Sequence, residues 1–274
     1  MDMTEEKQVN SSKSPWRWIL LGIALGLFIL WLSLTPEGVL GKADAVGYAV
    51  CHRIPERSFK IGDRQMPMCA RCTGLFLGAM LGLGFQLAQG RKGKMPPIPA
   101  AILFGSLALA WVLDGINSFT MLTPVLPSLY QTQNWTRLVT GTGMGLAISA
   151  ILLPAFIQTM FKTWEESSGF GMWHQVLIIL GLGATLDILV LFEIPWLQYL
   201  FSLISAGSVF VLLTLIYSMV LVMMFKKENT YENITQLFIS FTGGFILALL
   251  QIGAIDLVRY LLTGGWGGFN ITPL

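Results

Sequence analysis

The chain has 274 residues, of which 54% are hydrophobic and 12% are charged, and its formal net charge is +2. This composition is far more apolar than that of a soluble globular domain and is typical of proteins that cross a membrane several times. The small net charge, with basic residues in short clusters beside apolar runs, excludes a nucleic-acid-binding protein. We therefore expect membrane lipids as the main partners of the chain and no nucleic-acid partner.

The N-terminal part of the chain contains a polar segment and a first apolar run. Residues 1–15 are polar and rich in Ser, Lys and Glu, so we expect a disordered tail. The apolar run 16–34 is longer than that of a usual signal peptide, and the SLTPEG that ends it offers no small-x-small cleavage site. It is predicted to be retained as the first transmembrane helix.

Six more apolar runs reach the roughly 17 to 25 residues that a transmembrane helix needs. They are residues 73–89, 98–116, 138–161, 173–192, 201–225 and 235–262. The sequence therefore predicts an all-α fold, a polytopic transmembrane helical bundle of about seven spans. After the first helix, we divide the chain into an outer loop at 35–72, a three-helix membrane core at 73–161 and three further transmembrane helices at 162–274.

Lysine and arginine alternate between the segments that join these spans. With the N-terminus inside, the outer segments after the third, fifth and seventh spans hold almost no basic residues, and the loop 35–72 is the exception. The inner segments hold Lys7, Lys13, Arg17, Arg91, Lys92, Lys94, Lys162, Lys226 and Lys227. We predict a multi-pass protein of the cell (plasma) membrane with a cytoplasmic N-terminus and the loop on the outer face; the opposite orientation stays open.

Residues 51–74, CHRIPERSFKIGDRQMPMCARCTG, hold every cysteine and one of the two histidines. Cys69 and Cys72 form a CxxC pair before a glycine-rich span, and Cys51 and His52 lie far enough upstream to fold back onto it. Three thiolates and one imidazole form a tetrahedral ligand set that suits zinc. Because Cys51 and His52 are adjacent, one of them can instead face a substrate, which leaves three ligands and an open position.

Two other uses of the cysteines remain open. On an oxidising outer face, Cys51 can form a disulfide with Cys69 or with Cys72. Alternatively, Cys69 and Cys72 can be the redox-active pair of a membrane thiol–disulfide oxidoreductase, because a CxxC at a helix N-terminus has a lowered thiol pKa. Alternatively, the cysteines only fasten the loop to the helices of a transporter or structural membrane protein.

Charged residues within the predicted spans gather on the outer side. Such residues cost about 2.5 to 3.5 kcal/mol each on insertion, so they normally face a partner or a wet cavity. The set comprises Asp114, Arg137, Asp187, Glu193, Asp256 and Arg259. Individual members, such as Asp114 with Arg137, can be ion pairs that only hold helices together, but the group as a whole indicates a polar cavity that opens outward.

Glycines predict which spans approach closely. Gly74, Gly78 and Gly82 recur every four residues on the second span, as do Gly141 and Gly145 on the fourth, which is the small-xxx-small pattern of close helix packing. We expect these two spans to touch. Their contact would place two arginines, each just before the glycines of its span, at the same outer opening of the polar cavity.

Those arginines are Arg71 and Arg137, and with Arg57 we take them as binding residues for an anionic or lipid-like substrate, because arginine binds phosphate and carboxylate in a bidentate way. Whether the protein is an enzyme stays open. If it is, we expect metal-assisted hydrolysis or transfer, with His52 as fourth ligand or general base and Asp114 orienting an arginine or moving a proton. The oligomeric state is not predicted.

Several of these motifs together resemble a known family. The strings CHRIPERSF and GDRQMPMCARCTG, then Asp114-Gly115, Asn134, Arg137 and Thr140-Gly141, are similar to the prokaryotic family of predicted integral membrane proteins called domain of unknown function 2085. The similarity covers residues 45–154. It implies a membrane protein without an established activity, and it implies signature positions at Cys51, His52, Cys69, Arg71, Cys72, Asp114 and Arg137.

Overall fold

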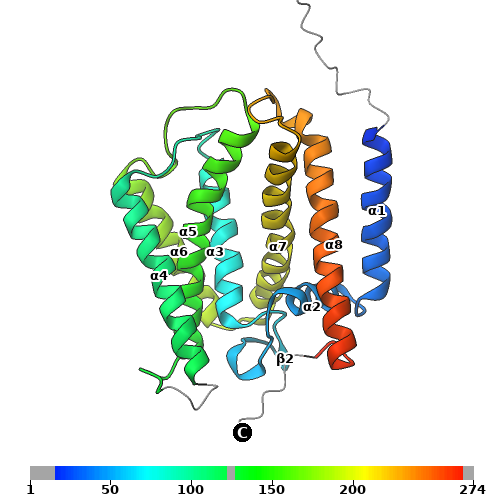
Figure 1. The fold of residues 1–274 in the computed structure, drawn as a ribbon. Helices are drawn as coiled ribbons and strands as arrows, with labels where there is room; N and C mark the ends of the chain where they lie inside the picture. Colours follow the sequence, from blue (N-terminus) through cyan, green and yellow to red (C-terminus); the bar gives the residue numbers. More distant parts are fainter. Residues whose placement is uncertain (1–15, 122–126, 268–274) are drawn as a thin grey trace, which may run out of the picture.

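The structure is a computed structural model, and it describes residues 16–121 and 127–267. Seven helices stand side by side in one bundle (Figure 1), and all are long and apolar enough to cross a membrane. They are α1 (Trp16–Leu34), α3 (Ala70–Leu87), α4 (Ile98–Thr120), α5 (Asn134–Met160), α6 (Trp173–Leu191), α7 (Pro195–Met224) and α8 (Phe238–Thr263), the last preceded by the 3-10 turn η3 (Ile234–Leu237). The predicted all-α bundle of about seven spans is confirmed. The predicted tail, residues 1–15, lies outside the described residues.

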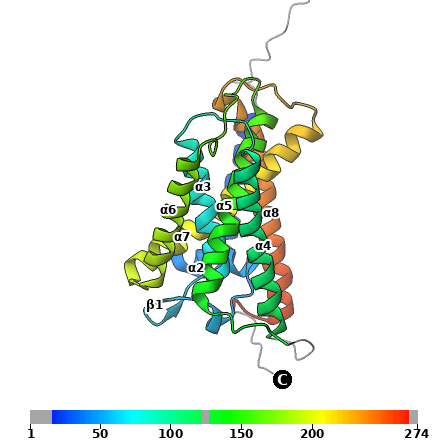
Figure 2. The ribbon, with the colours of Figure 1, turned by 90° about the vertical axis from the view of Figure 1, so that its left-hand side faces the viewer.

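The segment between α1 and α3 is more ordered than the sequence predicted. It contains the helix α2 (Val39–Val50), the 3-10 turn η2 (Pro55–Arg57) and a hairpin of two short antiparallel strands, β1 (Lys60–Ile61) and β2 (Arg64–Gln65). Gly62 forms the hairpin turn with a φ of +60°, a conformation that glycine adopts without strain. These elements lie at the end of the bundle opposite the start of α1 (Figures 1 and 2).

Helices α3 and α5 pack backbone to backbone at the centre of the bundle. A Cβ atom added to Gly78 would lie 2.5 Å from the carbonyl oxygen of Thr142, and one added to Gly145 would lie 2.1 Å from that of Leu75. No side chain larger than hydrogen fits at either position, as small-xxx-small packing requires. The predicted contact between the second and fourth spans is confirmed.

The last three spans complete the same bundle. Helix α7 packs against α2, α3, α5 and α8, and α6 against α3 and α5. Helix α1 stands at one edge, where α8 is its main neighbour (Figure 1). The core around the start of α3 is therefore built by helices from both halves of the chain.

The two ends of the bundle differ in chemistry. The connections α3–α4, α5–α6 and α7–α8 meet at the end where α1 begins (Figure 1), and two of them are joined by an ion pair between Lys162 and Glu232 at 3.9 Å. These connections carry six of the nine basic residues from which the orientation was predicted, namely Arg91, Lys92, Lys94, Lys162, Lys226 and Lys227. The cysteine segment lies at the other end, so the two ends separate as predicted; which end faces the cytoplasm stays a prediction.

Candidate metal centre and arginine cluster

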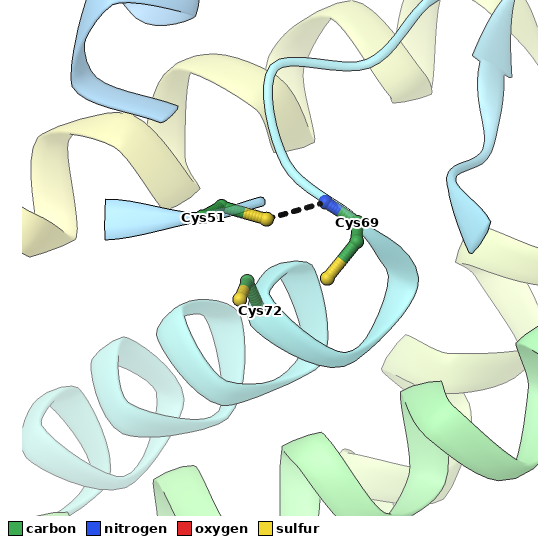
Figure 3. Close-up of side chains that lie close together, drawn as sticks. All are labelled: Cys51, Cys69 and Cys72. Carbon is green, nitrogen blue, oxygen red and sulfur yellow. Dashed lines mark hydrogen bonds between the residues drawn. The ribbon is translucent and has the colours of Figure 1, made fainter. Parts of the chain in front are cut away.

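Three cysteine thiols meet at the start of α3 (Figure 3). Cys69 directly precedes this helix, Cys72 lies in its first turn, and Cys51 follows α2 and lies opposite them. The three Sγ atoms lie within 4.8 Å of one another, and all three residues are free thiols. Zinc–sulfur bonds of about 2.3 Å in a tetrahedron place sulfurs roughly 3.8 Å apart, so a zinc ion fits this spacing with small side-chain adjustments.

Cys51 has the surroundings of a thiolate. Its Sγ accepts the backbone N–H of Cys69 at 3.3 Å, drawn in Figure 3, and that of Arg53 at 3.5 Å. Hydrogen bonds from Cys69 and Cys72 hold the pKa of Cys51 well below its usual value. The same contact with Cys51 raises the pKa of Cys69 to about 12. Cys51 therefore loses its proton more readily than Cys69 does, and a metal ion bound here would replace the thiol proton of Cys69.

His52 contacts this site through Cys51. Its Nδ1 lies 3.5 Å from the Sγ of Cys51. The donor atoms that are mutually close are, within the described residues, the three thiols without the imidazole. His52 therefore stays a prediction as fourth ligand or general base.

An ion pair between Arg53 and Asp44, which the sequence did not predict, fixes the extended segment after Cys51. Arg53 has a φ of +53°, which is unusual for a residue other than glycine, and its Nη2 donates to Oδ1 of Asp44 on α2 at 2.8 Å. The other oxygen of Asp44 accepts from Arg64 on β2 at 2.5 Å. The hairpin and α2 are thus tied together around one carboxylate, which holds Arg53 where its N–H reaches Cys51.

Arg259 on α8 secures the C-terminal end of α2. Its guanidinium donates to the carbonyl oxygens of Tyr48 and Cys51, the latter at 2.6 Å, and lies 4.0 Å from the centre of the Tyr48 ring. Carbonyls at a helix C-terminus carry partial negative charge and favour a cation. The sequence places Asp256 and Arg259 at the i, i+3 spacing of an ion pair, but Arg259 binds these backbone carbonyls and thus positions the segment that carries Cys51.

Asp114 near the end of α4 pairs with Arg71, the residue inside the CxxC motif. Nη2 of Arg71 forms an ion pair with Oδ2 of Asp114 and also donates to the Asp114 carbonyl oxygen at 3.1 Å. Asp114 is 1% exposed, and its Oδ1 accepts the hydroxyl of Tyr130 at 2.7 Å. The suggested pairing of Asp114 with Arg137 is not found among the described ion pairs; Arg71 on α3 binds this carboxylate instead.

Arg57 and Arg137 have uncharged partners instead. Arg137 donates to Oγ1 of Thr132 at 2.5 Å and to Oδ1 of Asn134 at 2.9 Å, and Arg57 donates to Oγ of Ser118 at 3.1 Å. In each case two hydrogen bonds, one from each Nη atom, orient the guanidinium group. Both therefore keep their charge uncompensated by a direct carboxylate contact among the described residues.

These three arginines lie within electrostatic reach of one another. Burial, and then the charge of Arg71, lower the pKa of Arg57, and Arg137 interacts with both. We call Arg57, Arg71 and Arg137 the arginine cluster; its buried counter-charge is Asp114. The Nε atoms of Arg71 and Arg137 are buried without a hydrogen-bond partner in the described part of the chain. The predicted anion-binding residues are thus brought together, and Cys69 interacts with two of them.

Comparisons with known proteins address the same region. The family described as Predicted membrane protein (DUF2085) matches residues 51–151, from Cys51 into α5. An uncharacterized protein of Methanocaldococcus jannaschii is 27% identical over 161 residues, which are 54% of this chain and 97% of that protein. An uncharacterized protein of Methanothermobacter thermautotrophicus is 32% identical over 110 residues, 39% of this chain and 90% of that protein. No solved structure matches.

The matched range carries the whole candidate site. It includes the three cysteines, the arginine cluster and Asp114, and it leaves out α6, α7 and α8. The family resemblance noted in the sequence is confirmed by the match. The chain belongs to the DUF2085 family of predicted membrane proteins.

Proposed function

We propose that this membrane protein carries a zinc centre at Cys51, Cys69 and Cys72 and uses it for hydrolysis or group transfer on an anionic or lipid-like substrate. The observation that carries the proposal is the position of Arg71. This residue lies between two of the thiols in sequence and belongs to the arginine cluster. A metal site and an anion site would therefore share one helical turn.

The donor set supports zinc. Thiolates are soft ligands, and three of them within 4.8 Å leave one position of a tetrahedron for His52 or for water. The N–H groups of Arg53 and Cys69 would stabilise the Cys51 ligand. When bound with an open position, zinc supplies a water that ionises near neutral pH. The burial of Cys51 and Cys69 keeps bulk water away from the ligands.

The arginine cluster supports an anionic substrate. Three guanidinium groups interact with the buried Asp114 and the exposed Glu56, which leaves one positive charge that a phosphate or carboxylate would neutralise. Asp114 acts in this proposal as a positioning residue, since it holds the Nη2 edge of Arg71 and leaves its Nε free. The hydroxyl of Tyr130 fixes the second carboxylate oxygen in turn.

The distribution of basic residues supports a site on the outer face. The connections at the opposite end hold Arg91, Lys92, Lys94, Lys162, Lys226 and Lys227. Basic connections remain in the cytoplasm in most multi-pass proteins. The substrate would then be an anion or lipid headgroup at the outer membrane surface.

A thiol–disulfide function is the second candidate. It is supported by the three free thiols, but the contact with Cys51 raises the pKa of Cys69 to about 12, so the lowered thiol pKa expected for the CxxC pair is not found at Cys69. In that case Cys69 and Cys72 would cycle between dithiol and disulfide, and a bound metal would block the reaction. The two proposals thus differ in whether the purified protein binds metal through these thiols.

Cobalt(II) binding tests the proposal. Added to reduced, metal-free protein in detergent, Co²⁺ should give the intense absorption of tetrahedral cobalt–thiolate bonds and saturate at an equimolar amount. Cys51→Ser should lose most of this absorption. Arg71→Lys should keep it but lose the spectral change that inorganic phosphate causes in the wild type. Absence of thiolate absorption in the wild type would refute the metal centre, and a phosphate response in Arg71→Lys would refute the role of the cluster.

A further inference from the structure

A cavity of about 600 Å³ lies between α1 and α8, at the end of the bundle that carries the thiols. Its walls are mostly apolar and include Leu30, Leu250 and Leu257, and Gly253 on α8 leaves space next to Trp31 on α1. Ligand pockets commonly have volumes of about 300 to 1,000 Å³. Figure 1 shows α1 standing at the edge of the bundle beside α8, so a cavity lined by these two helices lies at that edge.

One carboxylate belongs to this apolar wall. Asp256 on α8 is 3% exposed, and its Oδ2 accepts the indole N–H of Trp31 at 3.2 Å. Its Oδ1 is buried and has no hydrogen-bond partner among residues 16–121 and 127–267. A buried polar atom without a partner is costly, and the cost rises in a membrane, where no water replaces the missing bond. Asp256 therefore lacks one hydrogen bond, and because the residue lines the cavity, a small rotation of its carboxyl group brings Oδ1 within reach of a ligand hydroxyl there.

The surrounding charges select a neutral head group. Arg259, one turn further along α8, interacts with Asp256 electrostatically while its guanidinium binds the carbonyls of Tyr48 and Cys51. Arg259 and an ionised Asp256 carry opposite charges one helical turn apart, so a charged head group of either sign is attracted by one of them and repelled by the other. A hydroxyl is uncharged and both donates and accepts, so it pairs with Oδ1 whether or not that carboxyl group is protonated.

We propose that this cavity binds a long-chain lipid alcohol, with its hydroxyl on Asp256 and its chain along the apolar wall between α1 and α8. The site is separate from the thiols, although Trp31 belongs to the same buried apolar cluster as Cys51 and Cys69. The proposal goes beyond the proposed function and does not require a bound metal.

Photo-crosslinking in lipid nanodiscs tests the proposal. The probes are a long-chain alcohol with a mid-chain diazirine and the same chain ending in a methyl group. The alcohol should label peptides of α1 and α8 about tenfold more strongly, as expected for one hydrogen bond of about 1.4 kcal/mol inside a membrane. Asp256→Leu should reduce the alcohol labelling to that of the methyl probe, whereas Asp256→Asn should retain a preference because its carbonyl oxygen still accepts.

Three further variants serve as controls. Asp187→Asn changes another buried carboxylate, which binds Thr142 and does not line the cavity, so the preference for the alcohol should persist. Gly253→Leu should reduce labelling by both probes, because an added Cβ lies 4.0 Å from Trp31 and the side chain enters the cavity. The metal-site variant Cys69→Ser/Cys72→Ser should be labelled like the wild type, which separates this test from that of the metal centre.

The outcomes that overturn the proposal are distinct. Equal labelling by the two probes in the wild type would mean that the cavity takes only ordinary acyl chains. A preference for the alcohol that survives Asp256→Leu would place the hydroxyl elsewhere. If Asp256→Leu does not fold, the Gly253→Leu variant decides, since unchanged alcohol labelling there would exclude this cavity.

Discussion

Arg71 forms an ion pair with Asp114 and thereby joins the CxxC motif at the start of α3 to the last turns of α4. Asp114 is almost fully buried, and Tyr130 donates to its second oxygen at 2.7 Å. Because Arg71 lies between Cys69 and Cys72, this contact connects the segment that carries two of the thiols to the arginine cluster.

Replacing the buried carboxylate tests the arginine cluster. Asp114→Asn leaves Arg71 without its counter-charge, and breaking a buried ion pair costs about 3 kcal/mol or more. We expect a lower thermal unfolding midpoint in detergent, and we expect inorganic phosphate to restore much of the loss by supplying negative charge.

Asp187→Asn is the matched control. It removes a buried carboxylate at the same end of the bundle that accepts from Thr142 rather than from arginine. Its unfolding midpoint should not respond to phosphate beyond the response of the wild type. An Asp114→Asn protein that phosphate does not stabilise would contradict anion binding by the cluster.

The glycine contact between α3 and α5 predicts a position-specific loss of stability. A Cβ at Gly78 would lie 2.5 Å from a backbone oxygen of Thr142, so Gly78→Ala must separate the helices, at a cost of about 1 to 3 kcal/mol. Gly84→Ala, on the same helix with nothing within 4 Å, should be neutral or slightly stabilising. Thermal unfolding of both variants checks this, and equal effects would argue against the close contact.

Metal affinity should depend on pH. The pKa of Cys69 is raised to about 12 by its contact with Cys51, so Cys69 is protonated at neutral pH in the metal-free site and a metal must displace that proton. Affinity therefore rises as pH rises, by about tenfold per pH unit for each proton released. Competition with a chelator between about pH 6 and pH 8, corrected for the chelator's own protonation, measures this slope. A flat profile would mean that no thiol proton is displaced.

The orientation in the membrane can be tested by labelling. Lys60→Cys places a thiol on the exposed hairpin at the cysteine end, and Lys227→Cys places one on an exposed connection at the opposite end. A membrane-impermeant maleimide added to intact cells should label the first variant, and should label the second only after permeabilisation. The wild type provides the background from its native cysteines, and the reverse pattern would place the thiol site in the cytoplasm.

Much of the fold could be predicted from the sequence because the membrane imposes length and polarity on each span. The helices α4 and α6 begin at the predicted residues, and the glycine repeats on α3 and α5 indicated their contact. The helix α2 was not predicted, since its 12 residues include Gly41, Lys42, Asp44 and Gly47 and give no apolar run. It is stabilised by tertiary contacts, in which Asp44 and Arg259 take part.

The candidate site was predictable in its residue types but not in its pairings. The CxxC spacing placed Cys69 and Cys72 on one helical turn, and a loop of sufficient length allowed Cys51 to reach them. Which arginine binds Asp114 depends on the helix rotations that α3, α4 and α5 adopt on packing, and no local pattern encodes those. Tyr130 and Asp44 were missed for the same reason: their partners are 9 to 20 residues away in sequence, across a turn or loop, where helix and strand periodicity predicts no contact.

The metal content of the purified protein tests the central claim most directly. Mass spectrometry on wild type purified in detergent without added metal should find close to one zinc ion per chain, and the Cys69→Ser/Cys72→Ser variant should contain almost none. Thiol titration in parallel should find reduced cysteines in the wild type once the metal is removed. A wild type without metal and with oxidised thiols, or a variant that keeps its zinc, would contradict the metal centre.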